Sequence, residues 1–233
     1  YRLGTTLNIA SGGTLVVQLP DDRNSLNEIQ STVNLSEGGT LAHGTGNDSK
    51  FNATYTNGIT IVETAEVPGD VATIRVPCHK RGITTSRLNG SGILEIRRPQ
   101  GYNDGPGLFT QSTFAIDGAD ENEANRFTGE IRVNSPNDGE KYTYLSLNHQ
   151  FAAQKARISL QAARSGLFLG ADTVVVAGLE STQAAAKVEV LPGLTSASSN
   201  LTIDYSGSEA LTFSGKVMEG VSITKSGSGT QIL

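Results

Sequence analysis

The 233-residue sequence predicts an all-β chain wound as a parallel β-helix (a solenoid), with a β-sandwich as the alternative. Apolar and polar residues alternate, which is the period of a strand with one face toward a core and one toward water. Clusters of Gly, Asn, Ser and Asp separate these segments about every ten residues and mark turns. Only residues 148–163 have any helical character, and we expect strand and turn there too.

Three internal repeats favour the solenoid. Gly-Gly-Thr-Leu at 12–15 recurs at 38–41, an offset of 26 residues. Gly-Ser-Gly at 90–92 recurs at 227–229, and the aromatic motif Phe-Thr-Gly recurs as Phe-Ser-Gly at 213–215. A period in the twenties matches one coil of a parallel β-helix, in which three short strands and three turns close one rung. The chain then holds about ten coils, about 45 Å long.

Composition excludes several classes of protein. A net charge of −5 and a pI near 5.2 argue against a nucleic-acid partner, which usually meets a basic face. Apolar runs are too short for a membrane-spanning helix, and a single cysteine forms no internal disulfide. Residues 230–233 have the pattern of a strand, so we expect 1–233 to be one β-helix domain and a fragment of a longer protein.

Two motifs and one longer segment carry a family resemblance. Lys-Ser-Gly-Ser-Gly-Thr at 225–230 resembles the K-x-G-x-G-T core of the autotransporter-associated β-strand repeat. Asn-Arg-Phe-Thr-Gly at 125–129 resembles the N-x-[FY]-[ST]-G step of the same repeat, and 151–179 is similar to the segment that follows it. The resemblance covers most of the chain from about residue 65 onward.

The resemblance implies a right-handed parallel β-helix that is exported from a Gram-negative bacterium and secreted or displayed at the cell surface. It implies a structural or adhesive role without a cofactor, and it does not imply catalysis. Glycans or host surface proteins are the expected partners. Open strand edges at incomplete coils would also favour self-association.

The chain departs from the repeat at residues 97–124, where we expect an inserted loop. Solenoids carry function on loops or on one lateral face, because their coils are committed to stacking. Arg97, Arg98, Tyr102 and Asp104 could bind a sugar, since an aromatic face covers C–H groups while charged neighbours bond hydroxyls. The alternative is a solvated loop whose arginines lie along the solenoid flank.

Towards its end the same loop contains a cluster of four acidic residues, Asp117, Asp120, Glu121 and Glu123. Closely spaced acids can supply the six to eight oxygens that calcium prefers. Their spacing fits neither an EF-hand loop nor the nonapeptide calcium repeat, so an acidic turn that aids solubility is the favoured interpretation.

Two enzyme hypotheses remain. Cys78 precedes His79, but neighbouring residues on a strand point to opposite faces, so we expect a buried thiol rather than a nucleophile. A polysaccharide lyase or glycoside hydrolase is the second hypothesis. A hydrolase needs two carboxylates about 5–10 Å apart. Its candidates lie on or beside expected strands and are Asp70, Glu95, Glu130 and Asp204.

Overall fold

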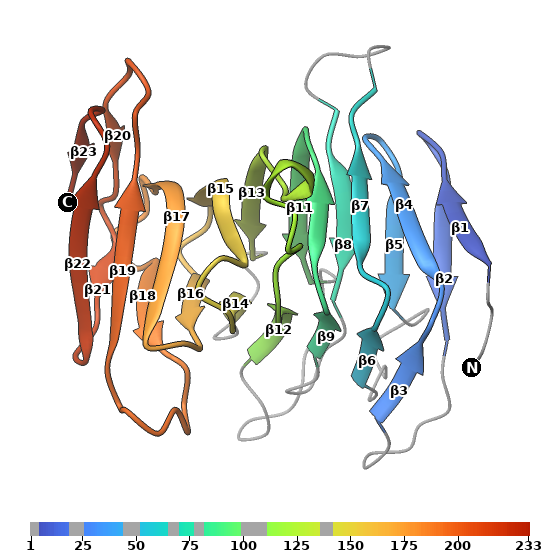
Figure 1. The fold of residues 1–233 in the computed structure, drawn as a ribbon, viewed down its shortest axis with the longest axis horizontal. Helices are drawn as coiled ribbons and strands as arrows, with labels where there is room; N and C mark the ends of the chain where they lie inside the picture. Colours follow the sequence, from blue (N-terminus) through green and yellow to red (C-terminus); the bar gives the residue numbers. More distant parts are fainter. Residues whose placement is uncertain are drawn as a thin grey trace.

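The computed structural model describes residues 5–18, 26–43, 52–64, 70–76, 82–98, 111–135 and 142–233. They form a three-faced solenoid whose strands stack along the long axis of the molecule (Figure 1). Every ladder between named strands is parallel, which confirms the parallel β-helix and excludes the sandwich. The longest sheet holds nine strands, one per coil, against the ten or so coils expected.

The first face begins with four short strands. They are β1 (Thr6–Ile9), β4 (Thr32–Ser36), β7 (Ile59–Val62) and β10 (Leu88–Gly90). The second face begins with β2 (Thr14–Val17), β5 (Thr40–His43), β8 (Ala72–Arg75), β11 (Ile93–Arg97) and β13 (Glu130–Asn134).

The third face is a sheet of eight strands. They are β3 (Leu26–Ile29), β6 (Asn52–Tyr55), β9 (Gly82–Thr85), β12 (Gln111–Ile116), β14 (Tyr142–Leu147), β16 (Ser165–Leu169), β18 (Lys187–Val190) and β21 (Lys216–Val217). The region 97–124, expected to be a loop, therefore contains the regular strand β12 and a short 3-10 helix, Glu123–Asn125.

Two long strands, β15 (Ala153–Leu160) and β17 (Thr173–Glu180), cross from the first face to the second without a turn. The end of β15 pairs with β13, whereas the start of β17 pairs with β19 (Ser199–Asp204), which in turn pairs with β22 (Val221–Ser226). Beyond the end of β17, the second face continues into the small strands β20 (Leu211–Thr212) and β23 (Gln231–Ile232). The strand predicted within 148–163 is thus β15.

Coil stacking explains the internal repeats. Thr14 pairs with Thr40 and Leu15 with Leu41, so the offset of 26 residues is one coil. Gly-Ser-Gly at 90–92 and 227–229 occupies the same corner, between β10 and β11 and between β22 and β23. The two Phe-x-Gly motifs lie at different corners. In both motifs the buried phenylalanine ring occupies the space where a Cβ atom of the third motif residue would lie. That third residue must therefore be glycine.

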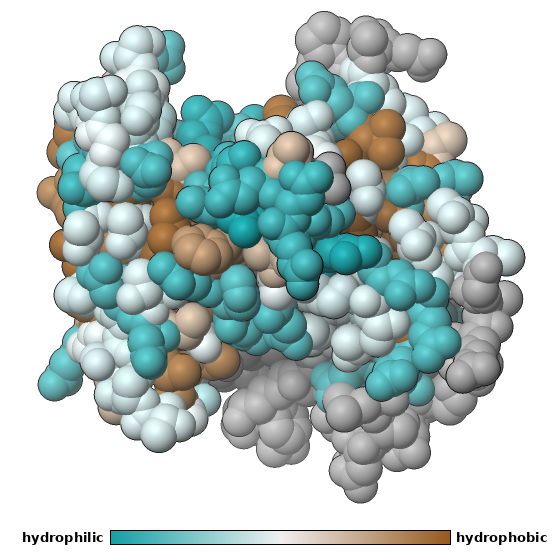
Figure 2. Space-filling model, in the orientation of Figure 1, coloured by the Kyte–Doolittle hydropathy of each residue, from teal (hydrophilic) through white to brown (hydrophobic). Residues whose placement is uncertain are grey.

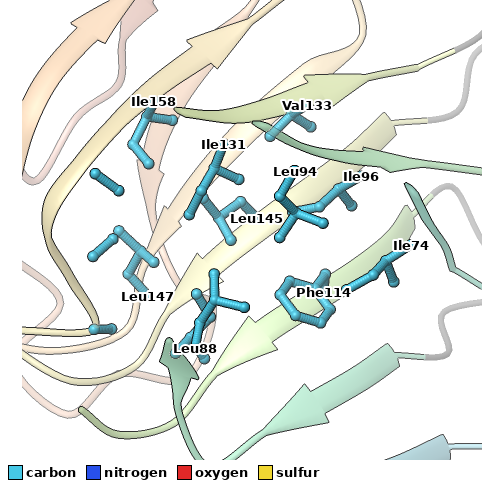
Figure 3. Close-up of a cluster of buried hydrophobic side chains, with 14 of the residues drawn as sticks. Ile74, Leu88, Leu94, Ile96, Phe114, Ile131, Val133, Leu145, Leu147 and Ile158 are labelled. Atoms are coloured by element: carbon cyan, nitrogen blue, oxygen red, sulfur yellow. The ribbon is translucent and has the colours of Figure 1, made fainter. Parts of the chain in front are cut away.

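The core consists of aliphatic side chains stacked in register. Leu41, Ile74, Ile96, Val133 and Leu160 occupy one row across five coils, and none is exposed to solvent. Side chains from the third face, among them Phe114 and Leu145, pack against these rows from the opposite side (Figure 3). Because each coil buries its inward residues against its neighbours, the apolar core is continuous along the axis.

Candidate functional site

A notch of about 480 Å³ lies at the corner between the first and second faces. Its lining comes from four consecutive coils: Thr128, Gly129 and Glu130; then Lys155 and Arg157; then Ala177; then Asp204, Tyr205, Ser206 and Gly207. This corner runs along the upper edge of Figure 1, where the loop after β19 rises above the bends of β15 and β17.

The notch follows from how successive coils turn this corner. The coil of β13 turns at Thr128–Gly129, and the coil of β19 turns through a loop at 205–210. The two coils between them turn inside continuous strands, with small residues at Ala177 and Gly178. Two flush coils between two protruding ones leave a hollow, and the upper outline of Figure 2 dips between the C-terminal coils and the middle of the molecule.

Glu130 is held at one wall by two arginines. Its carboxylate accepts a two-pronged contact from Arg132, Nε to Oε1 at 2.9 Å and Nη2 to Oε2 at 3.1 Å. Arg157, its register partner in the next coil, donates Nη2 to Oε2 at 2.7 Å. Burial opposes ionisation of Glu130, but these hydrogen bonds and positive charges outweigh it and lower its pKa. Glu130 is therefore a fixed anion rather than a proton donor.

Tyr205 forms the opposite wall, and its ring is held in one place. A Cβ added at Gly207 would lie 2.5 Å from Tyr205 Cζ, and one added at Gly229 would lie 2.6 Å from Cδ1. The Tyr205 hydroxyl donates to the carbonyl oxygen of Glu209 at 2.9 Å. Glycines let the ring lie against the backbone, and the hydroxyl bond fixes its orientation, so the notch has a rigid aromatic wall.

Two further charged side chains complete the notch. Lys155 Nζ donates to the exposed carbonyl of Glu123 at 2.8 Å. Asp204 accepts from Ser226 Oγ at 3.1 Å, on the side of the following coil. The notch thus combines a fixed aromatic ring with a cation and an anion whose hydrogen-bonding atoms lie near the surface. Such a lining is suited to a hydroxylated ligand.

Stacking brings two of the four strand-borne carboxylates, Glu130 and Asp204, to one site. Their backbones are three coils apart, about 14 Å at the usual strand spacing. Glu95 instead accepts from Asn134 at 3.2 Å, and Asp70 lies near Gly38 at the same corner several coils away. With its lowered pKa, Glu130 is unsuited to the general-acid role that a hydrolase requires.

The residues expected to bind sugar in the insertion are placed only in part. Arg97 is exposed at the end of β11 and lies 3.5 Å from Glu95. Arg98 is 1% exposed, because the next residue along a strand points the opposite way. Tyr102 and Asp104 lie outside the described residues. The ligand role of this group stays a prediction.

Three of the four acidic residues expected to hold calcium have separate partners. Asp117 accepts from Asn148 at 2.7 Å, Asp120 accepts from the backbone of Asn122 at 2.9 Å, and Glu123 lies 3.7 Å from Arg126. Glu121 is exposed. In the part of the chain that the structure describes, no three acidic, His or Cys side chains are grouped as metal ligands. Cys78 and His79 fall outside that part.

The third face carries a second group of aromatic side chains, Tyr142, Tyr144 and Phe168. The rings of Tyr144 and Phe168 stack at 3.8 Å between centroids, and Lys187 Nζ lies 4.4 Å from the centroid of Tyr142. Tyr144 and Phe168 are buried, whereas Tyr205 is partly exposed and lines the notch.

Sequence reasoning missed Tyr205, Lys155 and Arg157. The expected strand 201–205 placed Tyr205 in phase with Leu201 and Ile203, and its ring does pack against the core while it stays partly exposed. The strand ends at Asp204, and the Ser-Gly-Ser turn that follows was the available signal that the tyrosine lies at a corner.

Comparison with protein-family models, curated proteins and solved structures finds no match to this chain. No helix among the described residues has the length and apolar character needed to cross a membrane.

Proposed function

We propose that the chain is a structural and adhesive segment of an exported bacterial surface protein, and that it binds glycans at the notch. The observation that carries the proposal is Tyr205, whose ring is fixed between glycines beside charged side chains. An aromatic face covers the C–H groups of a sugar, while neighbouring charges bond its hydroxyls. The solenoid provides a rigid support on which such a site can be displayed.

The resemblance of 125–129 and 225–230 to the autotransporter-associated repeat supports the exported, surface-displayed part of the proposal. Contact with host surface proteins and self-association through open strand edges belong to the same proposal. The ion-paired state of Glu130 favours binding over hydrolysis.

A glycan array tests the proposal with the purified chain, with new reducing ends and unsaturated products assayed in parallel. We expect binding without product, lost in Tyr205→Ala and retained in Tyr102→Ala. Loss in Tyr102→Ala alone would move the site to the insertion. Product release would replace the adhesive function with catalysis, and absence of any binding would leave only a structural role.

A further inference from the structure

We infer that the notch selects acidic saccharides: a sugar carboxylate binds at Lys155 and Arg157 while its ring or its neighbour's lies against Tyr205. This inference rests on the proposed function and names its ligand class. It arises from the placement of charge within the notch, where both cations lie on β15.

The coil of β15 is locally cationic. Lys155 and Arg157 lie two residues apart on this strand, and both line the notch. The two anions of the lining lie on other coils: Glu130 on β13, where Arg132 also holds it, and Asp204 on β19. Glu180 on β17 also acts on the charge of Arg157. The four charges of the lining sum to zero, but the positive ones are confined to β15. An anionic group on a ligand is attracted to it.

Arg157 can bind a ligand without leaving Glu130 unpaired. Both carboxylate oxygens of Glu130 already accept from Arg132, so its satisfaction does not depend on Arg157. The hydrogen bond from Arg157 to Glu130 uses one of the five N–H donors of the guanidinium. The Arg157 side chain is 39% exposed and lines the notch, where a planar carboxylate is a suitable partner for its fork of donors.

Asp204 gives the site a direction. It lies two coils from Arg157, about 10 Å at the usual strand spacing, on the same side of the notch as Tyr205. A carboxylate accepts hydrogen bonds from sugar hydroxyls and repels a second carboxylate. An acidic sugar therefore binds with its carboxylate toward β15 and its hydroxyls toward β19.

Paired ligands that differ in the carboxylate test the inference. Calorimetry would compare an oligogalacturonide with its carboxyl-reduced, neutral counterpart, and sialyllactose with lactose. The two pairs separate an internal uronate from a terminal acidic sugar. We expect at least one acidic member to bind about tenfold tighter than its neutral partner, and added salt to reduce that difference.

Variants locate the effect. Arg157→Gln should bring the acidic ligand to the affinity of its neutral partner, and Lys155→Gln should reduce the preference. The hydrogen bond of Lys155 to the carbonyl of Glu123 is exposed, so its variant tests the site even where Arg157→Gln weakens the fold. Lys216→Gln, which removes an exposed cation from the third face, is the matched control and should change nothing.

The outcomes separate the two proposals. Equal binding of acidic and neutral ligands, or a preference for the neutral ones, overturns the inference and leaves glycan binding in place. Failure of all four ligands, with no binder on the array, overturns both. A preference for acidic ligands that Lys216→Gln abolishes as strongly as Lys155→Gln would show general charge attraction and would also overturn the inference.

Discussion

His43 is a histidine inside the solenoid. Its Nε2 lies 2.7 Å from the hydroxyl of Tyr55, and the two rings meet edge to face with centroids 5.7 Å apart. Burial, together with the charge of Arg75, lowers the pKa of His43 from 6.5 to about 3, although a backbone hydrogen bond at Arg75 opposes the shift. The folded chain therefore holds this imidazole neutral where an unfolded chain would protonate it.

That difference predicts a pH-dependent stability. Below pH 6.5 the unfolded chain takes up a proton that the folded chain does not, until the pH reaches about 3. As the pH decreases through this range, the free energy of unfolding should fall by up to about 1.4 kcal/mol for each pH unit. Urea unfolding between pH 7.5 and 4.5 would measure the slope, which His43→Gln should reduce.

Glu130, whose pKa is lowered, steepens the slope in the same direction at the acid end, so the difference between wild type and variant is the quantity to compare. His149→Gln is the control because His149 is exposed. An identical slope in wild type and His43→Gln would contradict a neutral buried histidine.

At the scale of the element, tight corners depend on glycines that lie against the preceding coil. A Cβ at Gly129 would overlap the carbonyl oxygen of Gly92 and lie 2.7 Å from Phe127 Cζ. Neither the backbone oxygen nor the buried ring can move aside without separating two coils. Gly129 also begins the wall of the notch, so the corner geometry and the site share one residue.

We therefore predict that Gly129→Ala lowers the free energy of unfolding by about 3 kcal/mol, as overpacking of a close contact does. Gly193→Ala is the comparison. Gly193 has φ +92° and open space around its Cβ position, so only the backbone strain of about 1 kcal/mol applies. Chemical denaturation of both variants measures the difference, and equal losses would show that coil spacing adjusts to the added methyl group.

At the scale of the whole molecule, stability accumulates from coil to coil. Ile96 stacks between Ile74 and Val133 and is fully buried. Ile223 lies in β22, which pairs only with β19 among the described strands, and is partly exposed. An interior residue thus has two stacked neighbours where Ile223 has one.

Ile96→Ala should cost about 3–4 kcal/mol of unfolding free energy and Ile223→Ala about 1 kcal/mol. The measurement is denaturant unfolding followed by circular dichroism in the 233-residue chain. A loss at Ile223 as large as that at Ile96 would argue against a stack in which each coil depends on its nearest neighbours.

Much of the architecture could be read from local pattern. Alternation identified the strand at 130–133, and the 26-residue offset between Leu15 and Leu41 proved to be one coil. The regular strand at 111–116 was missed because it follows a long Gly- and Pro-rich segment. Of the site, Glu130 and Asp204 were identified as candidates, but Tyr205, Lys155 and Arg157 were not.

By itself the sequence determined the two-residue period, the turns and the length of one coil, because these depend on residues close together in the chain. The tertiary structure decided which residues meet. Glu130 lies beside Arg157 across 27 residues because coil length sets the register. Tyr205 lines the notch because β15 and β17 turn the corner without a loop. Gly178 and Gly229 in the neighbouring coils have no side chain, which leaves room for the Tyr205 ring.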